Sequence, residues 1–311
     1  MTTRFLPTLA ALMAASAFLA ADDAKILFVA GKMSHGYNAH EHNAGSLLLA
    51  DRLNQSGLGF DASVYYNEED PGWPRNEQLL EGVKAVVIYC DGGKKHLANN
   101  HVGAIDALQE KGVGVGCLHY GVETIDGEAS EGFLRWMGGY YQLYKSVNPH
   151  WTPKFENLPD HPVANGVEPF SINDEWYFNM RFRKNMEGVT PILSAVPPED
   201  LLPEKDHHHN STPDGRAAVK RRDLQHVMWV SQNENGSRGF GFTGGHWHDN
   251  WQDDNFRKVV LNAICWIAQE TVPENGVSSA TPTEEELKRN QDYPFDPKKI
   301  RQDKYSGRKW K

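Results

Sequence analysis

The sequence predicts an α/β fold in which helices cover both faces of a mostly parallel sheet. Short apolar runs that end in turn residues recur through the first half of the chain, and segments with helical spacing separate them. Strands that alternate with helices are typical of βαβ units, and sheets of this kind are buried on both faces. The 311 residues, 39% hydrophobic and 23% charged, exclude a wholly disordered or fibrous protein.

The first half of the chain gives a regular series of expected elements. The run 25–30 (KILFVA) predicts a buried strand that ends at Gly31, and 41–56 carries leucines at helical spacing. The remaining expected elements, in order, are a strand at 60–66, a short helix near 75–82, a strand at 85–90, a helix at 98–111 and a strand at 112–119.

The pattern is looser after Gly121. Strand-like runs occur at 151–155, 170–178 and 191–196, and the polar stretch 197–225 is expected to be a long surface loop. Core strands are expected at 226–231 and 238–243, followed by an amphipathic helix at 253–269.

The two ends of the chain differ from the part between them. Residues 1–21 are expected to be a signal peptide, because Arg4 precedes an apolar run that ends in small residues. We therefore expect an exported protein, periplasmic or extracellular, with a main domain at 22–270 and no segment long and apolar enough to span a membrane. The Pro-rich, polar stretch 271–311 predicts an extended tail, which is either solvated or docks a partner through its basic end.

Charge and cysteine content bound the function classes. The formal net charge of −9 argues against sequence-independent nucleic-acid binding. Cys90, Cys117 and Cys265 lie in apolar runs and are expected to be buried thiols, although one disulfide remains open.

Histidines stand where three of the expected strands end. His35 lies in the loop after the first strand, His119 ends the run GVGVGCLH, and His246 and His248 end the last core strand. Ligands bind at the carboxyl edge of open α/β sheets, and imidazoles that converge there hold a divalent metal or act as acid and base. We therefore take His35, His119 and His246 as candidate ligands of zinc or manganese, with a structural hydrogen bond as the alternative for each.

The segment Cys117-Leu-His119-Tyr-Gly121 is typical of the sharp strand-to-helix turn called a nucleophile elbow. Its turn residue is His119, which serves as a base, ligand or oxyanion stabiliser rather than as an acyl-transfer nucleophile.

An ordered set of motifs resembles the trehalose-utilisation (ThuA-like) family over roughly 25–270. The set comprises KILFVAGKMSHG, GCLHYG, HPVANG, DEWY, and GFTGGHWHDN followed by FRKVVLNAICWIA. This family is related in fold to class I glutamine amidotransferases, so the resemblance implies a flavodoxin-like sheet. In those enzymes a cysteine occupies the elbow, whereas here His119 does, and His246 matches their second catalytic position. The resemblance therefore implies that glutaminase activity is absent.

The resemblance also implies a carbohydrate substrate, including oxidised (keto) sugars. Tyr120, Trp176 and Trp247 are candidates for stacking on sugar rings, although large aromatics more often serve as core. Of the adjacent carboxylates Asp174 and Glu175 only one should face the site, and we favour Glu175 as general base or ligand. A salt bridge from Glu175 to a nearby arginine is the alternative.

Two further motifs are not expected to be functional. Gly92-Gly93-Lys94-Lys95 lacks the glycine spacing and the Ser or Thr of a phosphate loop, so no nucleotide cofactor is expected. The three histidines 207–209 lie in a polar stretch, where adventitious metal affinity is the expected property.

The leading hypothesis is an exported ThuA-like enzyme that acts on a sugar or keto-sugar through His119, His246 and Glu175, with or without a divalent metal. A non-catalytic sugar-binding module, a hydrolase that uses activated water, and a protein that docks partners through its tail are the alternatives. The sequence leaves the oligomeric state open.

Overall fold

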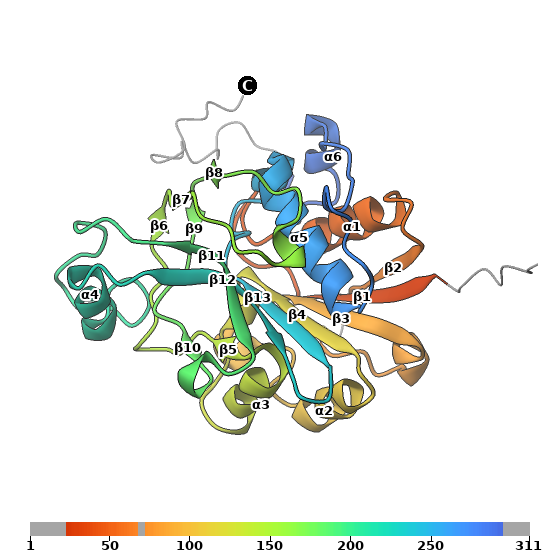
Figure 1. The fold of residues 1–311 in the computed structure, drawn as a ribbon, viewed down its shortest axis with the longest axis horizontal. Helices are drawn as coiled ribbons and strands as arrows, with labels where there is room; N and C mark the ends of the chain where they lie inside the picture. The colour runs from red at the N-terminus through yellow and green to blue at the C-terminus, as the bar shows by residue number, and fades with distance from the viewer. Residues whose placement is uncertain (1–22, 68–71, 295–311) are drawn as a thin grey trace, which may run out of the picture.

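A seven-stranded sheet forms the centre of the computed structural model, which describes residues 23–67 and 72–294 (Figure 1). Its strand order is β11-β12-β13-β4-β3-β1-β2. The bounds are β1 Ala24–Ala30, β2 Phe60–Tyr65, β3 Val83–Tyr89, β4 Gly114–Leu118, β11 Val189–Ala195, β12 Gln225–Gln232 and β13 Arg238–Phe242.

Five neighbouring strands of this sheet are parallel: β2, β1, β3, β4 and β13. Their order is that of flavodoxin-like sheets, in which the second strand lies at the edge and the first beside it. β12 runs antiparallel to both of its neighbours and extends the sheet towards β11. The predicted fold class, a mostly parallel flavodoxin-like sheet, is confirmed.

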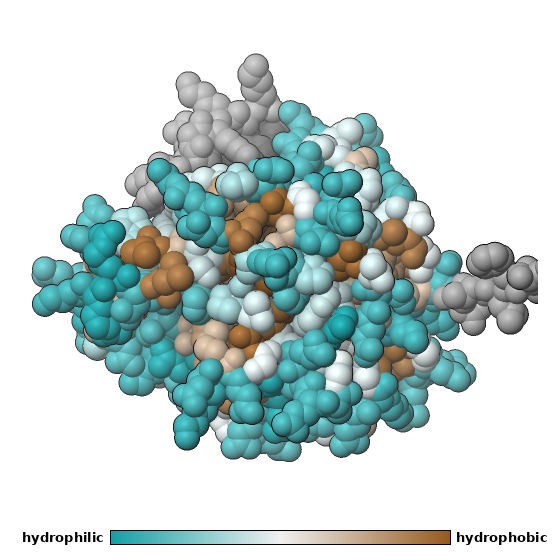
Figure 2. Space-filling model, viewed as in Figure 1, coloured by the Kyte–Doolittle hydropathy of each residue, from teal (hydrophilic) through white to brown (hydrophobic). Residues whose placement is uncertain are grey.

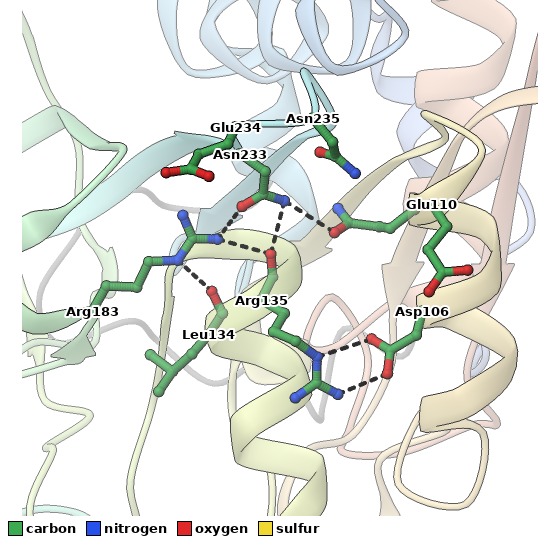
Figure 3. A pocket seen from close by; sticks show the side chains of 9 residues that line it. Asp106, Glu110, Leu134, Arg135, Arg183, Asn233, Glu234 and Asn235 are labelled. Carbon is green, nitrogen blue, oxygen red and sulfur yellow. Dashed lines mark hydrogen bonds and ion pairs between the residues drawn. The ribbon is translucent and has the colours of Figure 1, made fainter.

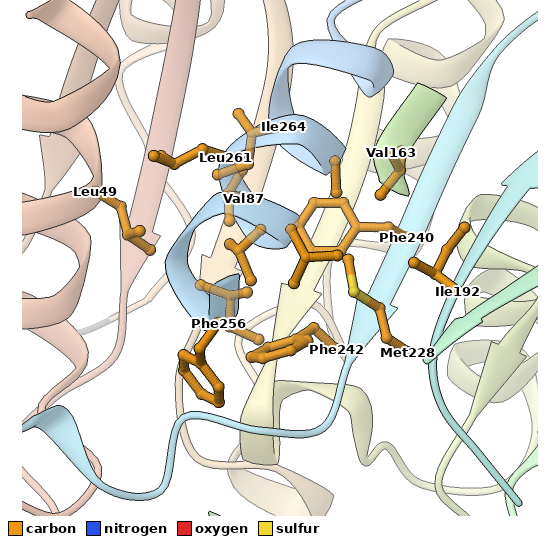
Figure 4. Close-up of a cluster of buried hydrophobic side chains, with 14 of the residues drawn as sticks. Leu49, Val87, Val163, Ile192, Met228, Phe240, Phe242, Phe256, Leu261 and Ile264 are labelled. Atoms are coloured by element: carbon orange, nitrogen blue, oxygen red, sulfur yellow. The ribbon is translucent and has the colours of Figure 1, made fainter. Parts of the chain in front are cut away.

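Helices cover both faces of the sheet, as the sequence predicts. The helices are α1 His42–Asn54, α2 Val102–Glu110, α3 Glu128–Met137 and α5 Asp254–Ile267. Alternate residues of β1 face opposite sides: Phe28 packs in the same cluster as α1 and α5, whereas Val29 packs with α2 and α3. Figure 4 shows the first of these clusters, where Val87 and Phe240 of the sheet meet Ile264 of α5.

The chain between β4 and β12 contains two helices that the sequence analysis did not predict. α3 was not predicted, and α4 (Pro213–Lys220) lies within the stretch expected to be a loop. α4 begins at a normal cap, because Thr212 Oγ1 accepts a hydrogen bond from the Gly215 backbone N–H at 3.0 Å. The strand-like run 191–196 largely coincides with β11 of the central sheet, and the runs 151–155 and 170–178 form two small pairs: β6 His150–Trp151 with β9 Asp174–Glu175, and β7 Lys154–Phe155 with β8 Phe170–Ser171. A third pair, β5 Gly139–Tyr140 with β10 Arg181–Phe182, lies outside the predicted runs.

The described part of the C-terminal segment packs against the main domain. Val277 is fully buried, and α6 (Glu284–Lys288) lies beside α1, where Glu286 forms an ion pair of 2.7 Å with Arg52. Residues 271–294 thus lie against the main domain and include one short helix. The basic end of the tail and the expected signal peptide 1–21 both lie outside the described residues.

All three cysteines are buried and unpaired, which agrees with their apolar sequence contexts. Within 23–67 and 72–294, no helix combines the length and the apolar character needed to cross a bilayer. The face shown in Figure 2 is largely hydrophilic, and hydrophobic residues appear on it in separate small patches.

Candidate functional site

The candidate site lies at the carboxyl edge of the parallel strands, where His119 follows β4 directly. His119 begins the 3₁₀ turn His119–Val122 with a φ of 51°, a left-handed conformation that is uncommon for a residue with a side chain. This is the sharp turn that the sequence predicts. Strained backbone of this kind persists where the surrounding structure holds it, and it is enriched at functional sites.

Four side chains converge in front of this turn: His40, His119, Glu175 and His246. The His40 Nε2 atom lies 3.0 Å from His119 Nε2 and 3.0 Å from His246 Nδ1. Glu175 Oε2 lies 3.1 Å from His246 Nδ1 and 3.5 Å from His119 Nε2. The four atoms all lie within 4.8 Å of one another, and the residues come from four separate parts of the chain.

The hydrogen bonds of His119 fix which of its nitrogens faces the cluster as an acceptor. Its Nδ1 lies 2.8 Å from the Thr243 carbonyl oxygen, which can only accept, so Nδ1 carries the proton. In the neutral imidazole, His119 Nε2 then presents a lone pair to the cluster. The Tyr177 hydroxyl lies 3.2 Å from this nitrogen and donates to Glu175 Oε2 at 3.3 Å, which ties the carboxylate to the histidines.

Electrostatics favour an anionic Glu175 and a neutral His40. Burial by itself raises the pKa of Glu175, but His246 and His119 outweigh it and hold that pKa well below its usual range. Burial, with a smaller contribution from the neighbouring histidines, holds the pKa of His40 well below its ordinary value. The cluster therefore combines imidazole nitrogens with a carboxylate in a largely dry place.

This donor set fits a divalent metal. Tetrahedral zinc with bonds of about 2.0–2.1 Å separates its ligand atoms by roughly 3.3–3.4 Å. Four of the six distances among the atoms here are 3.0–3.5 Å, and the other two are within 4.8 Å. Several lone pairs at these distances repel one another unless a cation or shared protons lie between them. His40, His119, Glu175 and His246 are therefore the residues that could hold an ion.

His40 is the residue that sequence reasoning missed. It lies well beyond the end of β1, at the start of α1, with a φ of 54°. Its backbone N–H donates to the His246 carbonyl at 3.0 Å, and Asn38 and Asp249 exchange two further hydrogen bonds between the same loops. The available sequence signal was the triplet His40-Glu41-His42 in a loop that follows a strand.

His35, the third predicted metal ligand, lies beside the four-residue cluster rather than in it. Its exposed ring stacks on His40 with the ring centroids 3.5 Å apart, and it shares a second group of potential ligands with His40 and Asp91. His248 is buried, and burial lowers its pKa to about 4.

Only one of the two adjacent carboxylates reaches the cluster, as expected from side chains that alternate along a strand. Glu175 reaches the cluster, whereas Asp174 is fully buried and accepts hydrogen bonds from the backbone N–H groups of Gly245 and His246 at 2.9 and 3.0 Å. Asp174 thus holds the loop that carries His246. The alternative partners of Glu175, Arg181 and Arg183, bind backbone carbonyl oxygens instead: Arg181 that of Asn179, and Arg183 those at the end of α3.

The three predicted aromatic residues occupy different places. Tyr120 and Trp247 are both half-buried beside the cluster. The ring centroid of Tyr120 lies 5.8 Å from that of His40, and the ring centroid of Trp247 lies 4.3 Å from that of His246. Trp176 is fully buried against Phe residues of the core, and its indole N–H donates to Ile172 O at 3.1 Å. Its expected place on the sugar-binding surface is therefore corrected to a core position.

Two motifs expected to be without function border the site. His209 extends from the polar stretch to buried Glu123, with 3.3 Å between His209 Nε2 and a carboxylate oxygen. Gly92 leaves room for the turn that carries Tyr120, because a Cβ there would lie 2.3 Å from the Tyr120 carbonyl oxygen. Gly92 thus allows two backbone segments to approach each other closely.

A large cavity lies at the opposite edge of the sheet. It has a volume of about 610 Å³ and is bordered by the ends of α2 and α3 and by the β12–β13 turn (Figure 3). Arg183 and Arg135 face it, but Arg183 binds Leu134 O, Arg135 O and Asn233, and Arg135 pairs with Asp106. Both guanidinium groups already have protein partners, so this cavity has no convergent set of unpaired polar groups comparable with the histidine cluster.

Comparison with known proteins decides the family. The model of the trehalose-utilisation family, ThuA, matches residues 25–267. This chain belongs to the ThuA family. The comparison with curated proteins found no match. The resemblance in the sequence motifs is thereby confirmed, and membership supports a role related to trehalose utilisation.

Solved structures of similar fold include two ThuA-like proteins. The chain is similar to a ThuA-like protein from Bacteroides uniformis, with a TM-score of 0.54, 18% identity, and 83% of this chain and 95% of that chain covered. A ThuA-like protein from Parabacteroides merdae gives a TM-score of 0.52, 15% identity, and 84% and 98% coverage. PurLQS from Thermotoga maritima gives a TM-score of 0.40, 13% identity, and 79% and 100% coverage. The fold assignment itself rests on the strand order.

Proposed function

We propose that this ThuA-family chain is an exported, metal-dependent enzyme that acts on a sugar or keto-sugar at the histidine cluster. The observation that carries the proposal is the convergence of His40 Nε2, His119 Nε2, His246 Nδ1 and Glu175 Oε2 within 4.8 Å of one another. Family membership supports the carbohydrate substrate. The sequence of residues 1–21 supports export.

His40, His119, Glu175 and His246 would hold a divalent ion, zinc or manganese, which would supply polarisation of a carbonyl group or a lowered pKa of a bound water. The protein's own groups supply orientation and proton handling. The Tyr177 hydroxyl contacts both Glu175 and His119, so it is placed to hold a proton at the edge of the cluster. Tyr120 and Trp247 provide half-buried aromatic surface beside the cluster, which suits the apolar face of a sugar ring.

The same geometry supports the absence of glutaminase activity. The elbow residue is His119, and Cys117 lies in the sheet with its side chain fully buried. Burial raises the pKa of the Cys117 thiol well above its ordinary value, so the thiolate needed for acyl transfer is disfavoured.

Elemental metal analysis of untagged mature protein tests the metal centre. We expect about one equivalent of metal in the wild type and a loss of that equivalent in His40→Ala, His119→Ala and His246→Ala. His207→Ala is the matched control, since it removes an exposed imidazole of the polar stretch and leaves the cluster intact.

The outcomes separate the competing functions. A wild type that takes up no metal after incubation with zinc or manganese would overturn the metal-dependent mechanism. Metal uptake together with sugar binding but no turnover on any sugar or keto-sugar would favour the non-catalytic binding module.

A further inference from the structure

A second carboxylate lies on the far side of His40 from the four-residue cluster. Asp91 stands two residues after the end of β3 and is largely buried. Its Oδ1 atom lies 3.6 Å from His40 Nδ1, the ring nitrogen that points away from the cluster. That nitrogen is fully buried and has no hydrogen-bond partner among the described residues.

The position of this carboxylate determines how His40 can act. The His40 Nε2 atom lies 3.0 Å from His119 Nε2 and 3.0 Å from His246 Nδ1. A neutral imidazole that offers Nε2 to a metal carries its proton on Nδ1, and an acceptor opposite Nδ1–H selects that tautomer and orients the ring. Asp91 is the acidic group on this side of His40.

Neighbouring groups hold Asp91 in this position. The Ser34 hydroxyl donates to Asp91 Oδ1 at 2.7 Å, and Lys95 Nζ lies 3.7 Å from Oδ2. His42 Nε2 approaches Oδ1 to 3.9 Å from the first turn of α1. The carboxylate is therefore fixed from three directions, by groups that follow β1 and β3.

We propose that Asp91 is the positioning residue of the metal centre: its carboxylate, 3.6 Å from His40 Nδ1, favours the tautomer that keeps the proton on Nδ1 and thereby directs Nε2 towards the ion. The inference rests on the proposed metal site at His40, His119, Glu175 and His246. It assigns Asp91 no contact with that ion.

The structure disfavours the other role for Asp91, as a ligand of a second ion together with His35 and His40. Such an ion would require His40 to give up both ring protons, since its Nε2 already belongs to the first cluster. The His35 ring is also exposed and its Nδ1 lies 2.7 Å from the Ser34 hydroxyl.

Calorimetric titration of the metal-free full-length mature protein with zinc alone tests the proposal. We expect Asp91→Asn to bind zinc about 10- to 100-fold more weakly than the wild type, the usual effect of losing a residue that orients a metal ligand, with the stoichiometry unchanged. Glu123→Gln is the matched control, because it neutralises another buried carboxylate at the same edge. Its zinc affinity should stay within about twofold of the wild type.

A spectroscopic measurement separates positioning from general damage. In the zinc-loaded wild type, ¹⁵N NMR should show a protonated His40 Nδ1, assigned by its loss in His40→Asn, and this signal should shift or broaden in Asp91→Asn. Zinc affinity in Asp91→Asn within twofold of the wild type, with the His40 signal unchanged, would overturn the proposal. A drop from two equivalents of zinc to one in Asp91→Asn would also overturn it, by making Asp91 a ligand. A wild type without zinc affinity would instead be the failure of the proposed function.

Discussion

Replacing Gly92 with alanine tests whether the backbone contact between Gly92 and the turn at His119–Val122 holds the proposed metal site in place. The added Cβ would lie 2.3 Å from the Tyr120 carbonyl oxygen and 2.8 Å from Glu123 Cβ, where real contacts are essentially never under 3.0 Å. Restoring even 3.0 Å requires a movement of 3.0 − 2.3 = 0.7 Å. A backbone carbonyl cannot rotate away as a flexible side chain does, so the turn that begins at His119 has to move.

The expected effects concern both stability and metal binding. Inserting a methyl group into a packed place costs about 1–3 kcal/mol, and each kcal/mol lowers the melting temperature of a domain of this size by about 2–4 °C. We expect Gly92→Ala to melt several degrees lower. It should also bind zinc more weakly, since metal–ligand distances tolerate only about 0.2 Å of change.

Thermal unfolding followed by circular dichroism, together with a zinc titration, measures both effects. Gly103→Ala is the control, because a Cβ at Gly103 in α2 meets nothing within 4 Å. That variant should be neutral or slightly stabilised. A Gly92→Ala protein with the melting temperature and zinc affinity of the wild type would refute the steric reasoning.

Three further predictions follow from other parts of the structure. Burial lowers the pKa of His96 to about 4 in the folded protein. Because the unfolded chain therefore binds a proton at a higher pH than the folded protein does, the free energy of unfolding decreases as the pH falls from about 6.5 towards 4. The loss amounts to roughly 3 kcal/mol, and unfolding of His96→Gln should depend less steeply on pH over that window. Trp176→Ala should cost about 3–5 kcal/mol as a core truncation, whereas Trp247→Ala should weaken sugar binding with a smaller change in melting temperature; the reverse pattern would contradict the placements given above. Cys117 should stay unreactive towards a thiol reagent until the protein is unfolded, and rapid labelling of the native protein would argue against its burial.

The order of strands and the histidines that directly follow them could be predicted from the sequence. The apolar runs around 25–30, 85–90 and 112–119 have the length and flanking turns of buried strands, so their carboxyl ends, and with them His119, could be located. His246 lies four residues after the end of β13, close enough for the strand to place it at the same edge. A residue at the end of a strand has a position that topology alone defines.

The other parts of the site depend on contacts that periodicity does not record. The loop that carries His40 is held by hydrogen bonds from the His40 N–H to the His246 carbonyl and from the His248 N–H to the Asn38 carbonyl, which involve backbone groups that any sequence has. Trp176 follows a strand of only two residues, too short for alternation to show which way the indole points. α4 is short and begins with Pro-Asp-Gly, a sequence also typical of turns, so only its packing identifies it as a helix.

The four groups of the cluster are far apart along the chain, and this has a consequence for how the protein matures. His40 and His119 are separated by 79 residues, and His40 and His246 by 206. The proposed ion-binding site therefore forms only after β13 has joined the sheet, so a nascent or unfolded chain has no preformed place for an ion. If the chain crosses a membrane unfolded, as the proposed export implies, the metal content of the compartment where it folds, rather than that of the compartment where it is made, determines which ion it acquires.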